Sequence, residues 1–382
     1  MSELHETAGI IEAWAARKGI LTYAALSSRP EPESPPPSEE VLRSLEGDQP
    51  RVGPSLLPQD ERIFDVVDHC ALVEILKKIR ITVIGLRRPN EIVLCHLNAV
   101  PRKRMRDLPQ RTVNGIKLEF FKSAEPIAQP PSINDPRSAA SARMVRGHYP
   151  CGSSISLATE RETGTLGCLM RNRHGTLLGL TANHVTGRCS TADHAMPVIA
   201  PGHADIVPGN LDPFTLGHHY GTTEWKAGTV NNVTVSENLD GAAFTIAKPE
   251  SVTSMQGDLY DTPAEIVTNP EGGMTVEKVG RSTGHTTGFV YFNVFRNIAV
   301  RFKIKGYEDT VHFEDMIAIV GSPVAFADRG DSGALVVTSG ESPRRAVGIL
   351  VAVTPDDTLA YVMPMDRVLS FFGCTLESGH NI

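Results

Sequence analysis

The sequence predicts a mainly β protein, because short apolar segments alternate with turns over most of its length. The 382 residues include 33 glycines and 27 prolines, which favour many turns over long helices. From about residue 144 the apolar segments have the length of strands, and no strong amphipathic helix is expected before residues 365–372. Such a pattern indicates a sandwich or a barrel. The expected strands are Thr165–Met170, Leu177–Thr181, Ala242–Ile246, Met316–Val320, Ala334–Val337, Ala346–Val353 and Leu359–Val362.

The part before residue 144 has a different pattern, which predicts separate units joined by linkers. Ile10, Ile11 and Trp14 recur at helical spacing and predict a short helix. A proline-rich, acidic stretch follows, where missing backbone donors and high charge favour a solvated linker. The expected organisation is an N-terminal helical segment (1–28), a linker (29–60), a small α/β domain (61–125), a second linker (126–143), the β body (144–374) and a tail (375–382).

The small α/β domain carries no motif with chemistry of its own and is a candidate regulatory unit. Its apolar pattern predicts a helix from Ile63 to Lys78 and strands at Ile81–Leu86, Ile92–Leu97 and Thr112–Phe121, with an Asn114-Gly115 turn inside or before the last strand. The residues before the β body are too many for a simple tail. They suit either occlusion of a cleft or recruitment of a partner, and the sequence leaves both open.

Composition and charge exclude several classes of function. A net charge of −7 gives no general reason to expect nucleic acid or a membrane as partner, and the basic cluster at 102–106 is interpreted as a solvated turn. No segment has the layout of a secretion signal or the length of a membrane helix. The six cysteines are dispersed without a Cys-x-x-Cys pair, which argues against a disulfide framework. We therefore expect a cytoplasmic protein.

No metal or cofactor is predicted. The metal-capable side chains at 189–219 have spacings that match no ligand motif, and the glycines at 284 and 288 lack the Gly-Lys-Ser/Thr ending of a phosphate-binding loop. The metal-capable residues are Cys189, His194, His203, Asp205, His218 and His219. We interpret them as hydrogen-bonded or exposed loop residues.

A serine stands in a turn suited to a nucleophile. The segment Gly330-Asp331-Ser332-Gly333 runs into an apolar strand at Ala334–Val337. The glycines allow a tight bend and leave backbone N–H groups free beside the hydroxyl. Taken alone, the same segment fits an ordinary surface turn before a strand.

A histidine and an aspartate also occupy strand ends. His184 follows the apolar strand at 177–181, and imidazole is well suited to accept and return a proton near neutral pH. Asp240 precedes the strand at 242–246, where burial requires a donor such as a histidine ring N–H. Each residue alone also fits a capping or packing role. The order His184, Asp240, Ser332 is that of the serine triad in two-barrel enzymes.

Over residues 144–373 the chain resembles trypsin-like serine proteases, and more narrowly the narrow-leaf family of intracellular trypsin-like proteins. A weaker likeness covers 98–108 and 113–120. The resemblance implies a chymotrypsin-like double β-barrel preceded by a small α/β domain. The matching segments are Gly164–Leu169, Thr181–Val185, Lys278–Gly288, Phe313–Asp315, Gly330–Gly333, Val347–Ile349 and Met363–Leu369.

The resemblance also implies roles. Ser332 would attack a peptide carbonyl, His184 would move the proton, and Asp240 would orient the histidine. The N–H groups of Gly330 and Ser332 would form the oxyanion hole.

The aspartate of the Gly-Asp-Ser-Gly turn, Asp331, requires a partner if it is buried. Residues 142–154 contain no Ile-Val-Gly-Gly-like sequence whose new N-terminus could supply one. In secreted bacterial relatives a basic side chain in the segment resembling 278–284 fills this need. We therefore expect Lys278 or Arg281 to pair with Asp331, so that no cleavage is needed for activation.

The substrate pocket is the least specified part of the site. The residue six before the serine is Phe326, which supplies no charge for a Lys/Arg pocket unless Asp328 turns inward. Glycine-rich walls of digestive trypsins are replaced at 350–353 by apolar residues, including Val351, Ala352 and Val353. His285 is a further candidate. Small or apolar side chains are the favoured substrate class.

The sequence thus predicts a serine endopeptidase that acts on a restricted protein or peptide substrate and is regulated by its N-terminal region. The alternative is a trypsin-fold scaffold that is non-catalytic or cleaves only itself. Homo-oligomerisation stays open.

Overall fold

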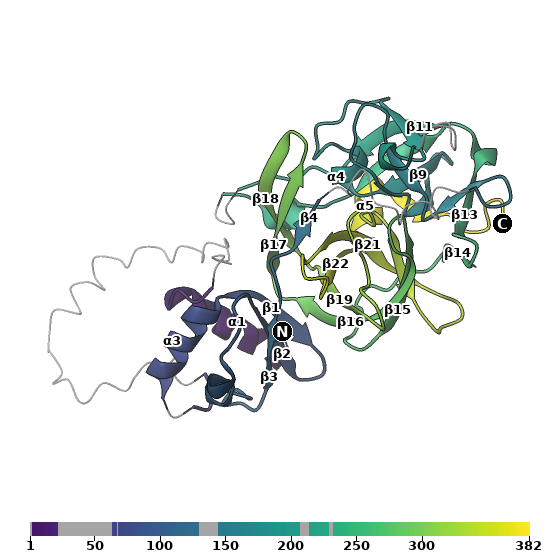
Figure 1. Cartoon of the computed structure of the whole chain (residues 1–382). Helices are drawn as coiled ribbons and strands as arrows, with labels where there is room; N and C mark the ends of the chain where they lie inside the picture. Colours follow the sequence, from purple (N-terminus) through teal and green to yellow (C-terminus); the bar gives the residue numbers. More distant parts are fainter. Residues whose placement is uncertain (1, 22–62, 67, 130–143, 207–213, 229–231) are drawn as a thin grey trace, which may run out of the picture.

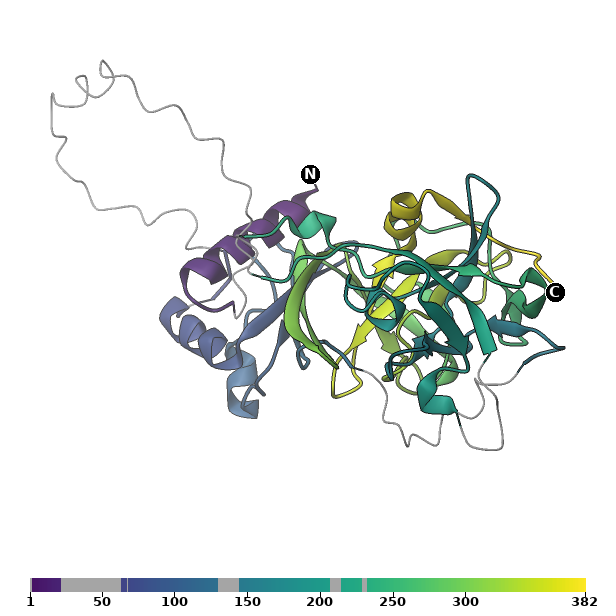
Figure 2. The same ribbon diagram turned by 90° about the horizontal axis from the view of Figure 1, so that it is seen from above.

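The computed structural model describes residues 2–21, 63–66, 68–129, 144–206, 214–228 and 232–382. The chain folds into a small α/β unit beside two larger β bodies (Figures 1 and 2). The fold is the mainly β, chymotrypsin-like double barrel with an α/β N-terminal domain that the sequence predicts. The linker expected at 29–60 lies outside the described residues.

The second β body is a closed ring of six strands. β15 (Thr275–Gly280) pairs with β16 (Gly284–Val294), and the pairing continues through the ring until it returns to β15. Because every strand has two neighbours, the strands close into a barrel; β21 extends beyond its pairing with β20, which ends at Ile349. The remaining strands, in ring order, are β19 (Ile317–Gly321), β22 (Ala360–Pro364), β21 (Ala346–Val353) and β20 (Leu335–Thr338).

The first β body is an eight-stranded sheet that forms the other barrel. Its strand order places β9 (Leu177–Thr181) beside β12 (Ala242–Ile246), the two strands that carry His184 and Asp240 at their ends. The sheet order is β23 (Cys374–Leu376), β8 (Cys168–Asn172), β9, β12, β11 (Phe214–Thr222), β10 (Pro197–Ala200), β6 (Ser154–Leu157) and β7 (Gly164–Thr165). A small sheet beside it contains β14 (Tyr260–Asp261), β13 (Val252–Gln256) and β5 (Tyr149–Cys151).

The α/β unit is built from two helices on a three-stranded sheet. The helices are α1 (Glu3–Arg17) and α3 (His69–Ile79), and the strands are β1 (Ile81–Arg87), β2 (Glu91–His96) and β3 (Lys117–Lys122). The apolar face of α1 is buried in one core with the rest of the unit, and Trp14 packs edge-on against Phe64 at 5.1 Å. Thus α1 shares one core with residues 63–118.

Helix α3 begins later than the expected start at Ile63. Asp68 is its N-cap, and its carboxylate accepts a hydrogen bond from the N–H of Ala71 at 2.9 Å. Phe64, expected to lie in this helix, forms an isolated antiparallel β-bridge with Thr112. The turn expected at Asn114-Gly115 precedes the third strand: the φ of Gly115 is +86°, and the strand starts at Lys117 rather than at Thr112.

The α/β unit and the second β body share a continuous sheet. Gly85 and Leu86 of β1 pair with the end of β16. Figure 1 shows the α/β unit beside this strand. Gly85 lies against the ring of Phe292, and a methyl group there would be 2.3 Å from a ring carbon. This close approach requires glycine.

Two segments expected to be irregular form strands. Residues 127 and 128, in the linker expected at 126–143, form β4 (Ile127–Ala128), which pairs with β21 and with β17 (Asn297–Ile304). β17 forms a hairpin with β18 (Tyr307–Glu314). The tail expected at 375–382 starts within β23, which pairs with β8. Residues 130–143 lie outside the described part of the chain.

Two further helices lie in the β bodies. The one-turn α4 (Asn183–Thr186) directly follows β9, and α5 (Met365–Phe372) follows β22, where the sequence predicts a helix. Short 3-10 turns occur at Arg102–Asp107, His203–Asp205, Val235–Glu237 and Pro249–Ser251.

Candidate active site

Ser332 lies in a turn that only glycines can shape. Gly330 and Gly333 have φ angles of +95° and +89°, a region that other residues seldom adopt. A methyl group on Gly333 would lie 2.9 Å from the backbone nitrogen of Ala182. The N–H of Thr165 also donates to the carbonyl of Ser332 at 2.9 Å. The serine turn is therefore packed against the end of β9, two residues before His184.

His184 and Asp240 form a buried pair. Nδ1 of His184 lies 2.7 Å from Oδ2 of Asp240, and the backbone N–H of His184 donates to Oδ1 at 3.1 Å. Both side chains are almost fully buried, with exposures of 4% and 0%. A carboxylate bonded at Nδ1 keeps the proton there and leaves Nε2 as the basic atom. Nε2 is buried and has no hydrogen-bond partner among the described residues.

The side chain of Asp331 lies in a cluster of polar groups and is itself fully buried. Nζ of Lys278 lies 3.2 Å from its Oδ2, and neither side chain is exposed. The carboxylate also accepts the N–H groups of Ser282 (2.7 Å), Thr283 (3.2 Å) and Asp328 (3.0 Å) and the hydroxyl of Thr283 (2.7 Å). Burial lowers the pKa of Lys278, and the charge of Asp331 opposes that change.

Arg281 has a different partner from the one considered for it in the sequence. Its Nε and Nη2 donate to both oxygens of Asp205, at 2.8 and 2.7 Å. Arg281 and Asp205 are 1% and 3% exposed. Of the two candidate partners, it is therefore Lys278 that contacts Asp331, while Arg281 joins the two β bodies through a bidentate ion pair.

The next pocket candidates are Phe326, His285 and Asp328. Phe326 is 2% exposed, and its carbonyl accepts the hydroxyl of Thr286 at 2.6 Å. Because side chains alternate along a strand, His285 faces the other way, and its Nε2 lies 2.7 Å from Glu277. That His285 lines the pocket stays a prediction. Asp328 contacts the backbone N–H of Arg329 through its own carboxylate, at 2.7 Å.

The apolar wall expected on β21 is covered by another segment of the chain. Val351, Ala352 and Val353 are all buried, and Val353 pairs antiparallel with Ile127 of β4. In general, an extended peptide can bind an exposed strand edge by adding a strand to it. Ile127 is not predicted from the sequence, because an apolar residue that follows a proline is a weak local signal.

A second unforeseen residue, Phe302 of β17, lies over the imidazole of His184. The ring centroids are 5.5 Å apart, and Phe302 is fully buried. Trp225 packs on the other side of Phe302 at 4.4 Å. Phe302 is also the register partner of Ala128 in β4. No strand is predicted from the sequence at 297–304, although the alternating apolar residues there are a signal for one; nothing local indicates its place against His184.

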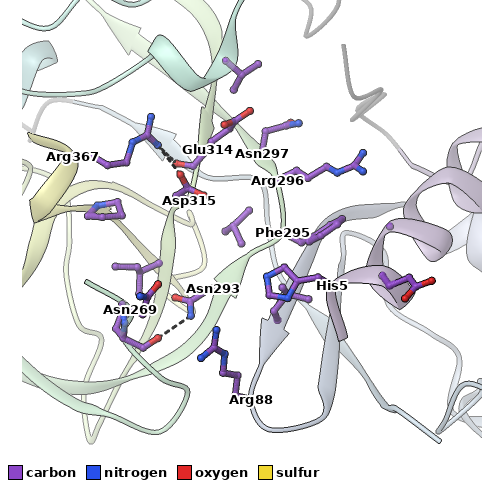
Figure 3. A pocket seen from close by; sticks show the side chains of 18 of the residues that line it. His5, Arg88, Asn269, Asn293, Phe295, Arg296, Asn297, Glu314, Asp315 and Arg367 are labelled. Carbon is purple, nitrogen blue, oxygen red and sulfur yellow. Dashed lines mark hydrogen bonds and ion pairs between the residues drawn. The ribbon is translucent and has the colours of Figure 1, made fainter. Parts of the chain in front are cut away.

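A cavity of about 930 Å³ lies at the junction of the α/β unit and the second β body. Figure 3 shows His5 and Phe295 on one side of it, facing Asp315 and Arg367. Arg367 contacts Asp315 at 3.4 Å. None of the three predicted catalytic residues lines this cavity.

Among the described residues, no group of three or more His, Cys, Asp or Glu side chains is placed to hold a metal ion. Of the side chains considered as ligands, Asp205 is held by Arg281, and the rings of His194 and His219 lie 6.4 Å apart. All six cysteines are described, and none is bonded to another. In the described part of the chain, no helix is long and apolar enough to cross a membrane.

No protein-family model matches the chain. The chain is 29% identical over 225 residues to the NARROW LEAF 1 protein of Oryza sativa subsp. japonica. That match covers 52% of this chain and 35% of the rice protein, so the chain spans about a third of the length of this relative.

Solved structures with a similar fold are serine proteases. Protease A of Thermobifida fusca has 16% sequence identity and a TM-score of 0.40, over 60% of this chain and 98% of the protease. Cellulomonas bogoriensis chymotrypsin has 14% identity and a TM-score of 0.36, over 60% of this chain and 97% of the enzyme.

Proposed function

We propose that the protein is a serine endopeptidase of the narrow-leaf type, in which Ser332, His184 and Asp240 form the catalytic triad. The observation that carries the proposal is the buried pair of His184 and Asp240 next to the glycine-shaped turn of Ser332. A carboxylate that is fully buried is costly, and its bond to a histidine ring supplies the needed donor. The unbonded cysteines fit a reducing compartment, and the proposal includes a cytoplasmic location.

In this proposal the reaction proceeds in two halves. Nε2 of His184 takes the proton from Ser332 as Oγ attacks the peptide carbonyl, and the same nitrogen returns the proton to the leaving amine. The N–H groups of Gly330 and Ser332 hold the oxyanion; in the described part of the chain neither donates to any acceptor. Water then hydrolyses the acyl-enzyme, with His184 acting again as base.

The N-terminal region would regulate this chemistry by covering the site. β4 leads from the α/β unit to β21, where it occupies the strand edge expected to bind substrate. It also pairs with Phe302, which lies over His184. We infer that β4 and the β17–β18 hairpin move away when substrate binds. This would restrict cleavage to proteins able to displace them.

Cleavage of a peptide library tests the proposed activity. The wild-type protein is compared with Ser332→Ala and with the control Ser251→Ala, whose hydroxyl contacts the carbonyl of Lys248. We expect cleavage after small or apolar residues by the wild type and the control, and none by Ser332→Ala. Cleavage that persists in Ser332→Ala would show a different nucleophile or a contaminating protease.

The competing function is a scaffold that keeps the fold without turnover or cleaves only itself. The covered state of His184 favours it over a constantly active enzyme. Release of the chain's own N-terminal fragment by the wild type, without cleavage of any library peptide, would support self-cleavage.

A further inference from the structure

The orientation of an oxyanion hole depends on the carbonyls that precede its donors. In a trans peptide group the C=O and the N–H point in opposite directions. The N–H of Gly330 belongs to the same peptide group as the carbonyl of Arg329, and the N–H of Ser332 to that of Asp331. Whatever holds these carbonyls therefore also aims the two N–H groups.

Each of the two carbonyls has a donor. The carbonyl of Asp331 accepts the N–H of Ala334 at 2.9 Å, a bond within the turn itself. The carbonyl of Arg329 accepts the hydroxyl of Ser282 at 2.5 Å. Ser282 comes from the hairpin between β15 and β16, so the first donor of the hole depends on a side chain outside the turn.

Ser282 is itself held on two sides. Nη1 of Arg281 donates to its Oγ at 3.0 Å, and this guanidinium is locked by its bidentate pair with Asp205. The backbone N–H of Ser282 donates to Asp331 at 2.7 Å. Arg281 and Asp205 are almost fully buried, so this chain of contacts is shielded from solvent.

The spacing between Ser282 and the turn admits no side chain at Gly330. A methyl group on Gly330 would lie 2.5 Å from Oγ of Ser282 and 2.7 Å from Nη1 of Arg281. The Cα of Gly330 therefore lies close against Ser282 and Arg281, and the preceding carbonyl accepts the Ser282 hydroxyl. Without the hydroxyl, the peptide group between Arg329 and Gly330 can rotate and turn its carbonyl, in place of the N–H, toward the bound substrate.

We infer that Ser282 is a positioning residue, which fixes the Gly330 N–H of the oxyanion hole by holding the carbonyl of Arg329. Asp205 and Arg281 act through Ser282 and connect this function to the other β body. The inference rests on the proposed protease function, since it assigns a role within the same site. Neither the order of the triad residues nor the partner of Asp331 implies it.

The experiment measures the reaction of Ser332 with a small fluorophosphonate probe. The phosphoryl oxygen of this probe must enter the oxyanion hole for the reaction to occur. The rate at saturating probe and the half-saturating concentration are determined for the wild type, Ser282→Ala, Ser282→Thr and the control Ser251→Ala. Loss of a direct oxyanion donor costs roughly 10²–10³-fold. Because Ser282→Ala only frees the donor to rotate, we expect a loss of about 10-fold or more in the saturating rate, with little change in the half-saturating concentration.

Ser282→Thr keeps a hydroxyl and should recover most of the rate, while Ser251→Ala should react like the wild type. If the wild type is labelled at Ser332 and Ser282→Ala has the same saturating rate, the inference about Ser282 is overturned. The proposed function is not affected by that result. A loss that Ser282→Thr does not recover would also overturn it. The absence of any Ser332 adduct, in the wild type and in Phe302→Leu, would overturn both.

Discussion

Phe302 lies over the imidazole of His184, with ring centroids 5.5 Å apart, and forms a register pair with Ala128 of β4. The N-terminal region thus reaches His184 through a single intermediate strand. The pairs His184–Asp240 and Lys278–Asp331 are formed beneath this cover, whereas Nε2 of His184 has no hydrogen-bond partner among the described residues. Control in our proposal therefore consists of uncovering the site.

Locking β4 to β21 tests this control. Ile127 and Val353 are cross-strand partners, so cysteines at both positions are placed to form a disulfide. We expect the oxidised Ile127→Cys/Val353→Cys protein to lose peptidase activity and to regain it on reduction. Each single variant, treated with the same oxidant, is the control. Full activity of the oxidised double variant would show that β4 is a permanent wall of the site.

Replacing Lys278 should destabilise the turn of the proposed nucleophile. Lys278→Met leaves the charge of Asp331 buried without its ion-pair partner, although four hydrogen bonds remain. Breaking a buried pair in this way costs on the order of 3 kcal/mol. Urea unfolding measures the loss, with Lys77→Met at an exposed position as control. Unchanged stability and activity in Lys278→Met would contradict the assigned pairing.

Asp240→Asn should keep the fold and lose most of the activity. The amide can no longer fix the Nδ1 proton of His184, and so the ring can adopt the tautomer that leaves Nε2 protonated. We expect kcat to fall roughly 10³–10⁴-fold. The exposed Asp258→Asn is the matched control. A loss of less than about tenfold would remove Asp240 from the proposed triad.

Stability should depend on pH through Glu12 of α1. Burial raises the pKa of Glu12 from its ordinary 4.5 to about 7, although Arg296 lies 2.6 Å away and opposes the change. Between these pH values the folded protein binds a proton that the unfolded chain does not, so stability falls as pH rises through this range. The shift corresponds to a loss of roughly 3 kcal/mol.

Chemical denaturation at pH 4.5 and pH 7.5 measures this dependence. Glu12→Gln cannot titrate at this position, and it should lose less stability than the wild type between the two pH values. Equal losses in both proteins would show that Glu12 is charged in the folded state throughout this range.

The sequence predicts those parts of the fold and site whose signals are local. The strands before His184 and after Ser332 follow from short apolar runs, and α5 lies at its expected residues. The start of α3 was also within reach, because Asp68 is a residue type that commonly caps helices. Apolar periodicity continues upstream of this cap, which explains the wrong start at Ile63.

The contacts that cover and align the site could not be predicted, because they join segments far apart in the chain. Ile127 and Ala128 form too short a strand to show a period, and only tertiary pairing defines them. Lys278 and Arg281 are both basic residues of the same hairpin. Only the position of Asp205 on the other β body decides which of them contacts Asp331.

Covalent labelling of Ser332 tests the central claim most directly. The wild-type chain, Ser332→Ala, His184→Ala and Ser251→Ala are incubated with a fluorophosphonate probe, and adducts are located by peptide mass spectrometry. Our account predicts one adduct, on Ser332, in the wild type and in Ser251→Ala, with much slower labelling in His184→Ala. The absence of a Ser332 adduct from the wild type, and also from Phe302→Leu with its cover loosened, would contradict it.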